Sequence, residues 1–541
     1  MDSPRPHFAI KLLPSMADLA FLLPMLYLFG RMDGVKTLLG DGDTGWHIRT
    51  GEWILSNHRV PAHDLFSYTK PGQPWVAWEW LSDVVFAWLN AHGGLATVLL
   101  VSVLMVSLTF AMVFRMARRK SSPLVAFLVL PLAVATSSVH WLARPHLFSL
   151  LFLVFFYSVL ERVRRGESRI FGLPCLVLLP AATILWTNLH AGFFVGIVLI
   201  GAFGAGEVLK LILAPGASSL TAERARAKAY FVTALACLAA SLLNPYSYHL
   251  HRHVFEYLGD PYQSAHIMEF LTLSFHHPVA IFFECLLVAS VGAALWNLAH
   301  GSYTEAVLIL VWGHAALLAA RNLPLFAVVA TPIVAGALHQ VLGCLPTWEL
   351  AGWLRRGAAR FLAIARETGE MESIPRWHLA SFAGVLILAA LLYAPAPPRR
   401  FRAEYDPAAY PAAALAVLEG DRSARIFTNA EWGGYLIYRL YPEVRVFIDG
   451  RSDFYGGSFG EKYIGIINVK YDWRKTLGEF GVDTILLPPS AALCGALKES
   501  SDWRVAYDDG VALVFRAART DRDNAASAAH LETAPKHPNG G

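Results

Sequence analysis

Charged residues are scarce in this chain of 541 residues. Asp, Glu, Lys and Arg make up 16% of it and hydrophobic residues 55%, whereas a soluble domain carries about 25% charged residues. The shortage comes from long apolar runs, and it excludes an ordinary soluble protein. The composition therefore predicts an integral, multi-pass membrane protein.

Cysteine is also rare. The five cysteines share no metal-ligand spacing and no disulfide pattern, so we expect them to be packing residues. The first apolar run lacks a small-residue cleavage site, which favours a retained helix over a removed signal. The net charge of +4 needs no nucleic acid partner, because the basic residues cluster in short loops between apolar runs.

Eleven apolar runs approach the length of about 20 residues that a membrane-spanning helix needs. The predicted spans are 16–39, 95–114, 123–139, 147–160, 171–187, 192–213, 229–243, 279–298, 306–318, 323–342 and 379–394. Clusters of Lys and Arg follow the second, fourth, sixth and tenth spans. They fall on one side of the membrane, which should be the cytoplasm. We therefore expect a bacterial inner (plasma) membrane protein with a cytoplasmic N-terminus and a periplasmic or extracellular C-terminal region.

This orientation places the unusual polar residues of the chain on the external face. They come from separate loops, and the candidates outside the first loop are Arg144, His146, Asn188, His190, Asn244, Arg321 and Asn322. A site assembled from several loops on one face is what a membrane enzyme or a binding pocket requires.

The first external loop, 40–82, carries the acidic pair Asp41 and Asp43. Carboxylates at the edge of a bilayer are costly to dehydrate, so such a pair indicates a function. It can take a proton from a hydroxyl, or it can provide oxygen ligands for a divalent cation such as Mg or Mn. The alternative is a simple turn, where Asp and Gly are common.

The same loop contains two tryptophan-rich stretches, 46–55 and 75–81. Their spacing predicts short amphipathic helices that lie on the external interface. The tryptophans are either interfacial anchors or the walls of a groove. Within the loop, the residues that we expect to bind substrate are Trp46, His47, Asp64 and Glu79.

The acidic pair in Asp41-Gly42-Asp43-Thr44-Gly45-Trp46-His47, the later Asp64-Leu65-Phe66-Ser67 and the many spans resemble the GT-C class of membrane glycosyltransferases. This class includes protein O-mannosyltransferases, aminoarabinose transferases and the catalytic subunits of oligosaccharyltransferases. The resemblance covers residues 16–394 in architecture and 40–82 in motif. It implies a sugar donor linked to polyprenyl phosphate and an external glycan, lipid or protein acceptor. The Trp-Trp-Asp motif of oligosaccharyltransferases is missing, which argues against protein N-glycosylation.

The chemistry that this resemblance implies can be placed on residues. Asp41 or Asp43 would take the proton of the acceptor hydroxyl, and Arg144 and Arg321 would stabilise the departing phosphate. Hydrogen bonds to phosphate or sugar would come from His146, Asn188, His190, Asn244 and Asn322. Two rivals stay open, namely a transporter or flippase of lipid-linked saccharides and a non-catalytic envelope scaffold.

After the last span, the sequence predicts a soluble external α/β domain over 395–519 and a disordered tail over 520–541. The transmembrane domain would cover 1–394. Strands are expected at 425–428, 444–448, 482–487, 503–507 and 511–515, in a mostly parallel sheet with an antiparallel edge. Asp449 and Arg451 follow a strand end, where α/β folds often bind ligands. The alternative for these two residues is a salt-bridged turn.

Overall fold

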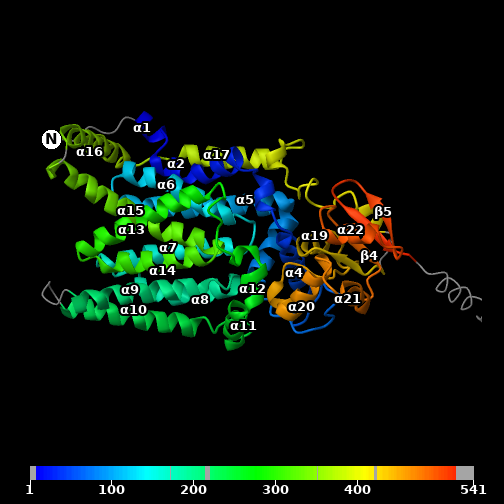
Figure 1. The fold of residues 1–541 in the computed structure, drawn as a ribbon. Coiled ribbons are helices and arrows are strands. Elements are labelled where there is room, and N and C mark those ends of the chain that lie inside the picture. The colour runs from blue at the N-terminus through cyan, green and yellow to red at the C-terminus, as the bar shows by residue number, and fades with distance from the viewer. Residues whose placement is uncertain (1–7, 171, 214–219, 350, 420–422, 519–541) are drawn as a thin grey trace, which may run out of the picture. The chain divides into compact units, whose positions relative to one another are not determined.

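The computed structural model describes residues 8–170, 172–213, 220–349, 351–419 and 423–518 (Figure 1). The predicted tail 520–541 lies outside these residues, as does the first residue of the predicted span 171–187. The chain divides into two compact units. The helical unit comprises Met1–Gly40, His47–Ala62 and Trp75–Glu404, and the sheet unit comprises Asp41–Trp46, His63–Pro74 and Tyr405–Gly541.

The helical unit is a bundle of long helices that run alongside one another (Figure 1). Its α-helices are α1 (Phe8–Leu12), α2 (Met16–Leu26), α3 (Val35–Leu38), α5 (Trp80–Lys120), α6 (Pro123–Ser137), α7 (His146–Arg164), α8 (Cys175–Leu189), α9 (Phe193–Leu213), α10 (Leu220–Ala240), α11 (Tyr248–Gly259), α12 (Pro261–His266), α13 (Ala280–Ala299), α14 (Tyr303–Leu318), α15 (Leu323–Cys344), α16 (Gly352–Glu372) and α17 (Leu379–Leu392). Shorter turns are η1 (Tyr27–Arg31), η2 (Ser138–His140), η3 (Met268–Phe270), η4 (Ala320–Asn322), η5 (Leu345–Thr347) and η6 (Arg399–Phe401), and β1 (Arg169–Ile170) pairs with β2 (Leu173–Pro174). A further helix, α4 (Asp43–Asn57), begins in the sheet unit and continues into the helical unit.

In the described part of the chain, seven helical segments are long and apolar enough to cross a membrane. They are Ile10–Arg31, Trp80–Lys120, Pro123–His140, His146–Arg164, Phe193–Leu213, Ala280–Ala299 and Ala320–Thr347. The apolar helices α8, α14 and α17 are shorter. Each of the eleven predicted spans falls on a helix, and the span 229–243 falls on α10. The fold is that of a multi-pass membrane protein.

The tryptophan-rich stretches of the first loop have different outcomes. The predicted helix at 46–55 is confirmed, because it lies within α4. The predicted helix at 75–81 is wrong: residues 75–79 are extended or turned, and α5 begins at Trp80. The reason is a backbone pairing, in which the amide of Trp75 donates to the carbonyl of Ala62 over 3.0 Å. Trp75 is only 4% exposed, so its indole packs inside the protein instead of anchoring at the lipid boundary.

The sheet unit holds four strands in the order β3-β4-β6-β5 among its described residues. β3 (Ile426–Thr428) pairs in parallel with β4 (Thr484–Leu487), whereas β6 (Leu513–Ala517) is antiparallel to both β4 and β5 (Trp503–Asp508). The helices are α18 (Leu415–Leu418), α19 (Ala430–Leu440), α20 (Ser452–Ile467), α21 (Trp473–Glu479) and α22 (Ala492–Lys498). A small α/β domain is therefore present, as the sequence predicts.

The predicted strand at 444–448 is wrong, and so is the mostly parallel sheet. Only Val446 forms β-bridges there, one to Ile426 and one to Ser67. The amide of Val446 donates to the carbonyl of Phe66, and its carbonyl accepts from the amide of Tyr68. The segment thus pairs locally with the first loop. One parallel and two antiparallel pairings then make up the sheet.

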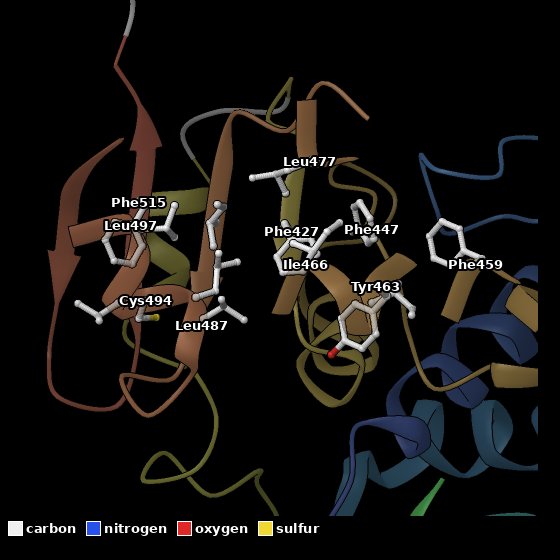
Figure 2. Close-up of a cluster of buried hydrophobic side chains, with 14 of the residues drawn as sticks. Phe427, Phe447, Phe459, Tyr463, Ile466, Leu477, Leu487, Cys494, Leu497 and Phe515 are labelled. Atoms are coloured by element: carbon white, nitrogen blue, oxygen red, sulfur yellow. The ribbon is translucent and has the colours of Figure 1, made fainter. Parts of the chain in front are cut away.

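An aromatic core holds the sheet unit together (Figure 2). Phe427 of β3 contacts Phe447 with ring centroids 4.8 Å apart, and Phe447 also contacts Phe459 of α20 at 5.5 Å and Phe480 at 5.0 Å. Cys494 of α22 is buried in the same cluster, as its prediction as a packing residue requires. Each fully buried Phe contributes about 1.5–3 kcal/mol relative to an exposed one. This core fixes the turn that follows Phe447.

Candidate functional site

The acidic pair begins helix α4. Asp43 is its first residue, and its amide donates to Oδ1 of Asp41 over 3.1 Å. Asp43 is only 7% exposed, and its carboxylate occupies the space that a side chain at Gly450 would need. A carboxylate in the first turn of a helix is favoured by the helix dipole. Asp43 is therefore held in one place, against the turn at Gly450.

Two buried phenols lie near this pair within the sheet unit. Burial raises the pKa of the Tyr405 hydroxyl, and the negative charge of Asp41, then Tyr438 and Asp43, raise it further. The pKa of Tyr410 is raised for the same reasons, by burial, then Tyr405 and Asp41. Both phenols therefore stay protonated around neutral pH, as hydrogen-bond donors in an acidic neighbourhood.

A metal would need more ligands than the pair provides. Among the described residues, no group of three or more His, Cys, Asp or Glu side chains is arranged to hold a metal ion. The divalent cation on Asp41 and Asp43 stays a prediction.

A second group of polar residues lies in the helical unit, and we call it the histidine–acid network: His47, Glu79, Asp83 and His190. Nδ1 of His47 lies 2.6 Å from Oδ1 of Asp83, and its Nε2 lies 3.7 Å from Oε2 of Glu79. Burial lowers the pKa of His47 well below its usual value, and Arg144 and His190 lower it further. The imidazole is therefore neutral, and its contact with Asp83 fixes the orientation of the ring.

His190 completes the network from the end of α8. The amide of Gly192 donates to Nδ1 of His190 over 2.9 Å, so the ring proton sits on Nε2. That Nε2 lies 3.4 Å from Oε1 of Glu79. Burial, then the charges of Arg321 and Arg144, lower the pKa of His190 to about 3. A neutral His190 can thus donate a hydrogen bond toward the site.

Two predicted phosphate ligands converge on one carboxylate, and we call this group the arginine clamp: Arg144, Arg321 and Glu269. Arg144 precedes α7 and lies 3.5 Å from Oε2 of Glu269, while Arg321 of η4 lies 3.3 Å from Oε1. Arg321 also lies over the ring of Phe270, 4.5 Å from its centroid. Burial would raise the pKa of Glu269, but Arg321 and Arg144 hold it at about 2. Glu269 is therefore an anion at neutral pH, balanced by two cations from separate loops.

His146 lies beside the clamp. Its Nε2 is 3.0 Å from the carbonyl oxygen of His140, and the two imidazole rings lie 4.3 Å apart. Nε2 of His140 is 3.6 Å from Glu269. His146 therefore supports the clamp through His140.

The three predicted asparagines make structural hydrogen bonds. Asn188 accepts from the indole of Trp80 and donates to the carbonyl of Leu243. Asn244 donates to the carbonyl of Ser241, and Asn322 donates to that of Ala315 over 2.9 Å. These bonds join or terminate helices.

Asp64, Asp449 and Arg451 form one buried group in the sheet unit. Arg451 donates to both oxygens of Asp449, over 2.8 and 2.7 Å, and to Oδ1 of Asp64 over 2.8 Å. The hydroxyl of Tyr455 donates to Asp449 over 2.8 Å. The side chains of Arg451 and both acids are at most 1% exposed. This geometry matches the salt-bridged turn.

Trp46 is buried in the sheet unit and 5% exposed.

Glu269, Asp83 and His140 lie in these groups but are not among the site residues that the sequence predicted. Glu269 stands alone among apolar residues in His266-Ile267-Met268-Glu269-Phe270. A lone acid in an external loop was the available signal.

Comparison with solved structures identifies the architecture. The chain has a GT-C-like membrane fold, which it shares with ArnT from Cupriavidus metallidurans in the apo state, at a TM-score of 0.50 and 14% identity over 92% of this chain and 97% of that chain. At this identity the likeness concerns the fold alone.

Two further likenesses fall below a TM-score of 0.5 and carry no weight. ArnT bound to undecaprenyl phosphate gives 0.41 at 14% identity, over 92% of this chain and 97% of that one. The oligosaccharyltransferase of Archaeoglobus fulgidus gives 0.49 at 12% identity, over 87% of this chain and 69% of that one. No family model and no curated protein sequence matches this chain.

Proposed function

We propose that this chain is a membrane glycosyltransferase that moves a sugar from a polyprenyl-phosphate donor to an acceptor outside the cytoplasm. The acceptor is a glycan, a lipid or a protein. The observation that carries the proposal is the arginine clamp, in which Arg144 and Arg321 reach one anion from two separate loops. Two arginines placed in this way can form charge-assisted hydrogen bonds with a lipid phosphate. The fold shared with ArnT supports the same reading.

In this proposal the acceptor hydroxyl attacks the anomeric carbon of the sugar. The bond from that carbon to the phosphate oxygen breaks, and polyprenyl phosphate leaves with its electron pair. The hydroxyl proton passes to Asp43 or Asp41. Arg144 and Arg321 take up the charge of the leaving phosphate in place of Glu269. Within the histidine–acid network, Glu79 and His190 provide hydrogen bonds to sugar hydroxyls.

The test uses the full chain in lipid nanodiscs with a panel of sugars linked to undecaprenyl phosphate. Mass spectrometry measures the release of undecaprenyl phosphate, with water standing in for the acceptor. We expect Asp43→Asn to slow release by about 10²–10⁴-fold, the usual contribution of a general base. The exposed Asp33→Asn serves as the matched control and should keep the wild-type rate.

A binding measurement tests the clamp separately. Arg144→Gln and Arg321→Gln should each weaken binding of undecaprenyl phosphate about tenfold or more, because charged hydrogen bonds are lost. The exposed Arg252→Gln should bind as the wild type does. If the wild type releases nothing from any donor but moves labelled donor across vesicles, the chain is a transporter and the proposal fails.

A further inference from the structure

An open cavity lies in the helical unit at the far end of α5 from the histidine–acid network. It has a volume of 650 Å³ and is lined by the end of α5, the start of α6, and parts of α15 and α16. Glu79 precedes the first residue of α5, and Lys120 is its last. The straight part of α5 after its glycine kink rises about 39 Å, at 1.5 Å per residue. The cavity and the network therefore face opposite sides of a bilayer.

The lining carries more positive than negative charge. Its charged residues are Arg119, Lys120, Arg366 and Glu370. Lys120 is neutralised by Glu161 at 3.0 Å and Glu305 at 3.1 Å. Arg366 and Glu370 are exposed and 4.0 Å apart, a pair of little strength.

Arg119 is left as the dominant charge of the wall. It lies within electrostatic range of Arg115, Arg162 and Arg165, and of the acid Glu167. Cations crowded in this way repel one another, and a bound anion would relieve the repulsion.

Neutral donors complete the wall. Ser122 caps the N-terminus of α6, a 15-residue helix whose first turn therefore borders the cavity. The dipole of that helix favours an anion at this end. Nδ1 of His339 on α15 is buried and makes no hydrogen bond with any described residue. Together with Arg119, these groups suit a phosphate oxygen.

Helix α16 indicates which kind of molecule carries the phosphate. Trp353 and Ile364 are 68% and 55% exposed and stand eleven residues apart, so they share one face. Arg355 and Arg366 share another face by the same spacing. An exposed helix with one apolar and one basic stripe lies in a membrane interface and attracts anionic lipid.

We propose that this cavity binds the phosphate-bearing headgroup of an anionic phospholipid in the leaflet that faces it, with Arg119 and Arg366 as its cationic contacts. The site is separate from the proposed donor site, and it does not depend on the proposed function.

The test measures retained lipid. Full-length protein is taken from nanodiscs of phosphatidylcholine with phosphatidylglycerol, and native mass spectrometry counts the bound phosphatidylglycerol. Arg119→Gln and Arg366→Gln should each lower its affinity about fivefold, the effect of one interfacial cation. Arg360→Gln serves as the control, because Arg360 is exposed on the same helix, lies off the face of Arg355 and Arg366, and does not line the cavity.

A second test fills the cavity without changing its charge. It also does not depend on whether Arg119→Gln folds correctly. Gly369 lines the cavity, and its nearest neighbour to a built Cβ is 3.8 Å away, so Gly369→Phe can fill the space. It should abolish selective retention of phosphatidylglycerol. Unchanged retention in Gly369→Phe and Arg366→Gln overturns the proposal. So does binding of inorganic phosphate with the same arginine dependence while phosphatidylglycerol shows none, because the ligand is then a soluble anion.

Discussion

At the scale of single residues, the arginines that we propose to bind ligand differ in burial from the arginine that stabilises the fold. Arg144 and Arg321 are partly exposed and paired with one acid, Glu269, whereas Arg451 is enclosed by Asp449, Asp64 and aromatic rings. A partly exposed cation can exchange its partner for a ligand. A fully buried one cannot do so without leaving a carboxylate unpaired.

Replacement of Arg451 tests this distinction. Arg451→Met leaves Asp449 and Asp64 buried without their cation, and we expect it to destabilise the protein by about 3–5 kcal/mol. The exposed Arg445→Met, six residues earlier, should change little. Thermal unfolding of the full chain in detergent measures both. Equal stability of the two variants would show that the buried group contributes nothing.

The buried His190 makes the stability of the protein depend on pH. The pKa of His190 falls from 6.5 to about 3 on folding, so the unfolded chain binds the extra proton at a higher pH. Stability from this group is complete above pH 6.5 and is lost as the pH falls toward 3.

His190→Gln removes this titration while keeping a hydrogen-bonding side chain. The loss of unfolding midpoint between pH 6.5 and 4 should therefore be smaller in His190→Gln than in the wild type. The exposed His276→Gln should follow the wild-type curve. Parallel curves for wild type and His190→Gln would contradict the assignment.

At the scale of elements, glycine decides the course of α5. Gly93 and Gly94 leave helical geometry, with φ of +66° and ψ of −169° at Gly94. Residues other than glycine rarely adopt this backbone conformation. The break separates the first turns of α5, which carry Asp83, from the apolar span that follows Leu95.

Alanine at Gly94 tests the break. Among the described residues, no atom outside the neighbouring backbone lies within 4 Å of a Cβ built at Gly94 or at Gly292, but Gly292 lies in a regular part of α13. Gly94→Ala should therefore destabilise the protein by about 1–3 kcal/mol through the backbone alone. Gly292→Ala should be neutral or stabilising. Calorimetry of the two purified variants would settle the comparison, and equal stability would mean that α5 can straighten at no cost.

Sequence patterns predicted the elements unevenly, for physical reasons. Each predicted membrane span falls on a helix, because burial in a bilayer demands a continuous apolar run. The predicted strand at 444–448 was wrong because a short apolar segment does not indicate whether a partner strand lies beside it. The segment 75–81 failed because backbone pairing between Trp75 and Ala62 outweighed helical spacing.

At the scale of the whole molecule, orientation in the membrane is the decisive expectation. The distribution of basic loops predicts that the first loop is external and that α16 is cytoplasmic. The native cysteines are first replaced by serine. Gln73→Cys in whole cells should then react with a membrane-impermeant maleimide, and Glu367→Cys should react only after the cells are opened. Both positions are exposed. The reverse pattern would invert the topology and remove the basis for the proposed transferase.

The sequence by itself determined the membrane class, the positions of the helices, the small α/β domain and the candidates Asp41, Asp43, Arg144 and Arg321. The class, the helices and the domain follow from composition and periodicity, which are local properties of a chain, and the roles of the four candidates follow from the resemblance to GT-C transferases. Only the tertiary structure decided which polar residues meet. It brought Glu269 between two arginines, placed Asp83 behind His47, and enclosed Asp64 with Arg451. Those partners are far apart in sequence, and burial and pairing between distant residues exist only once the chain has folded.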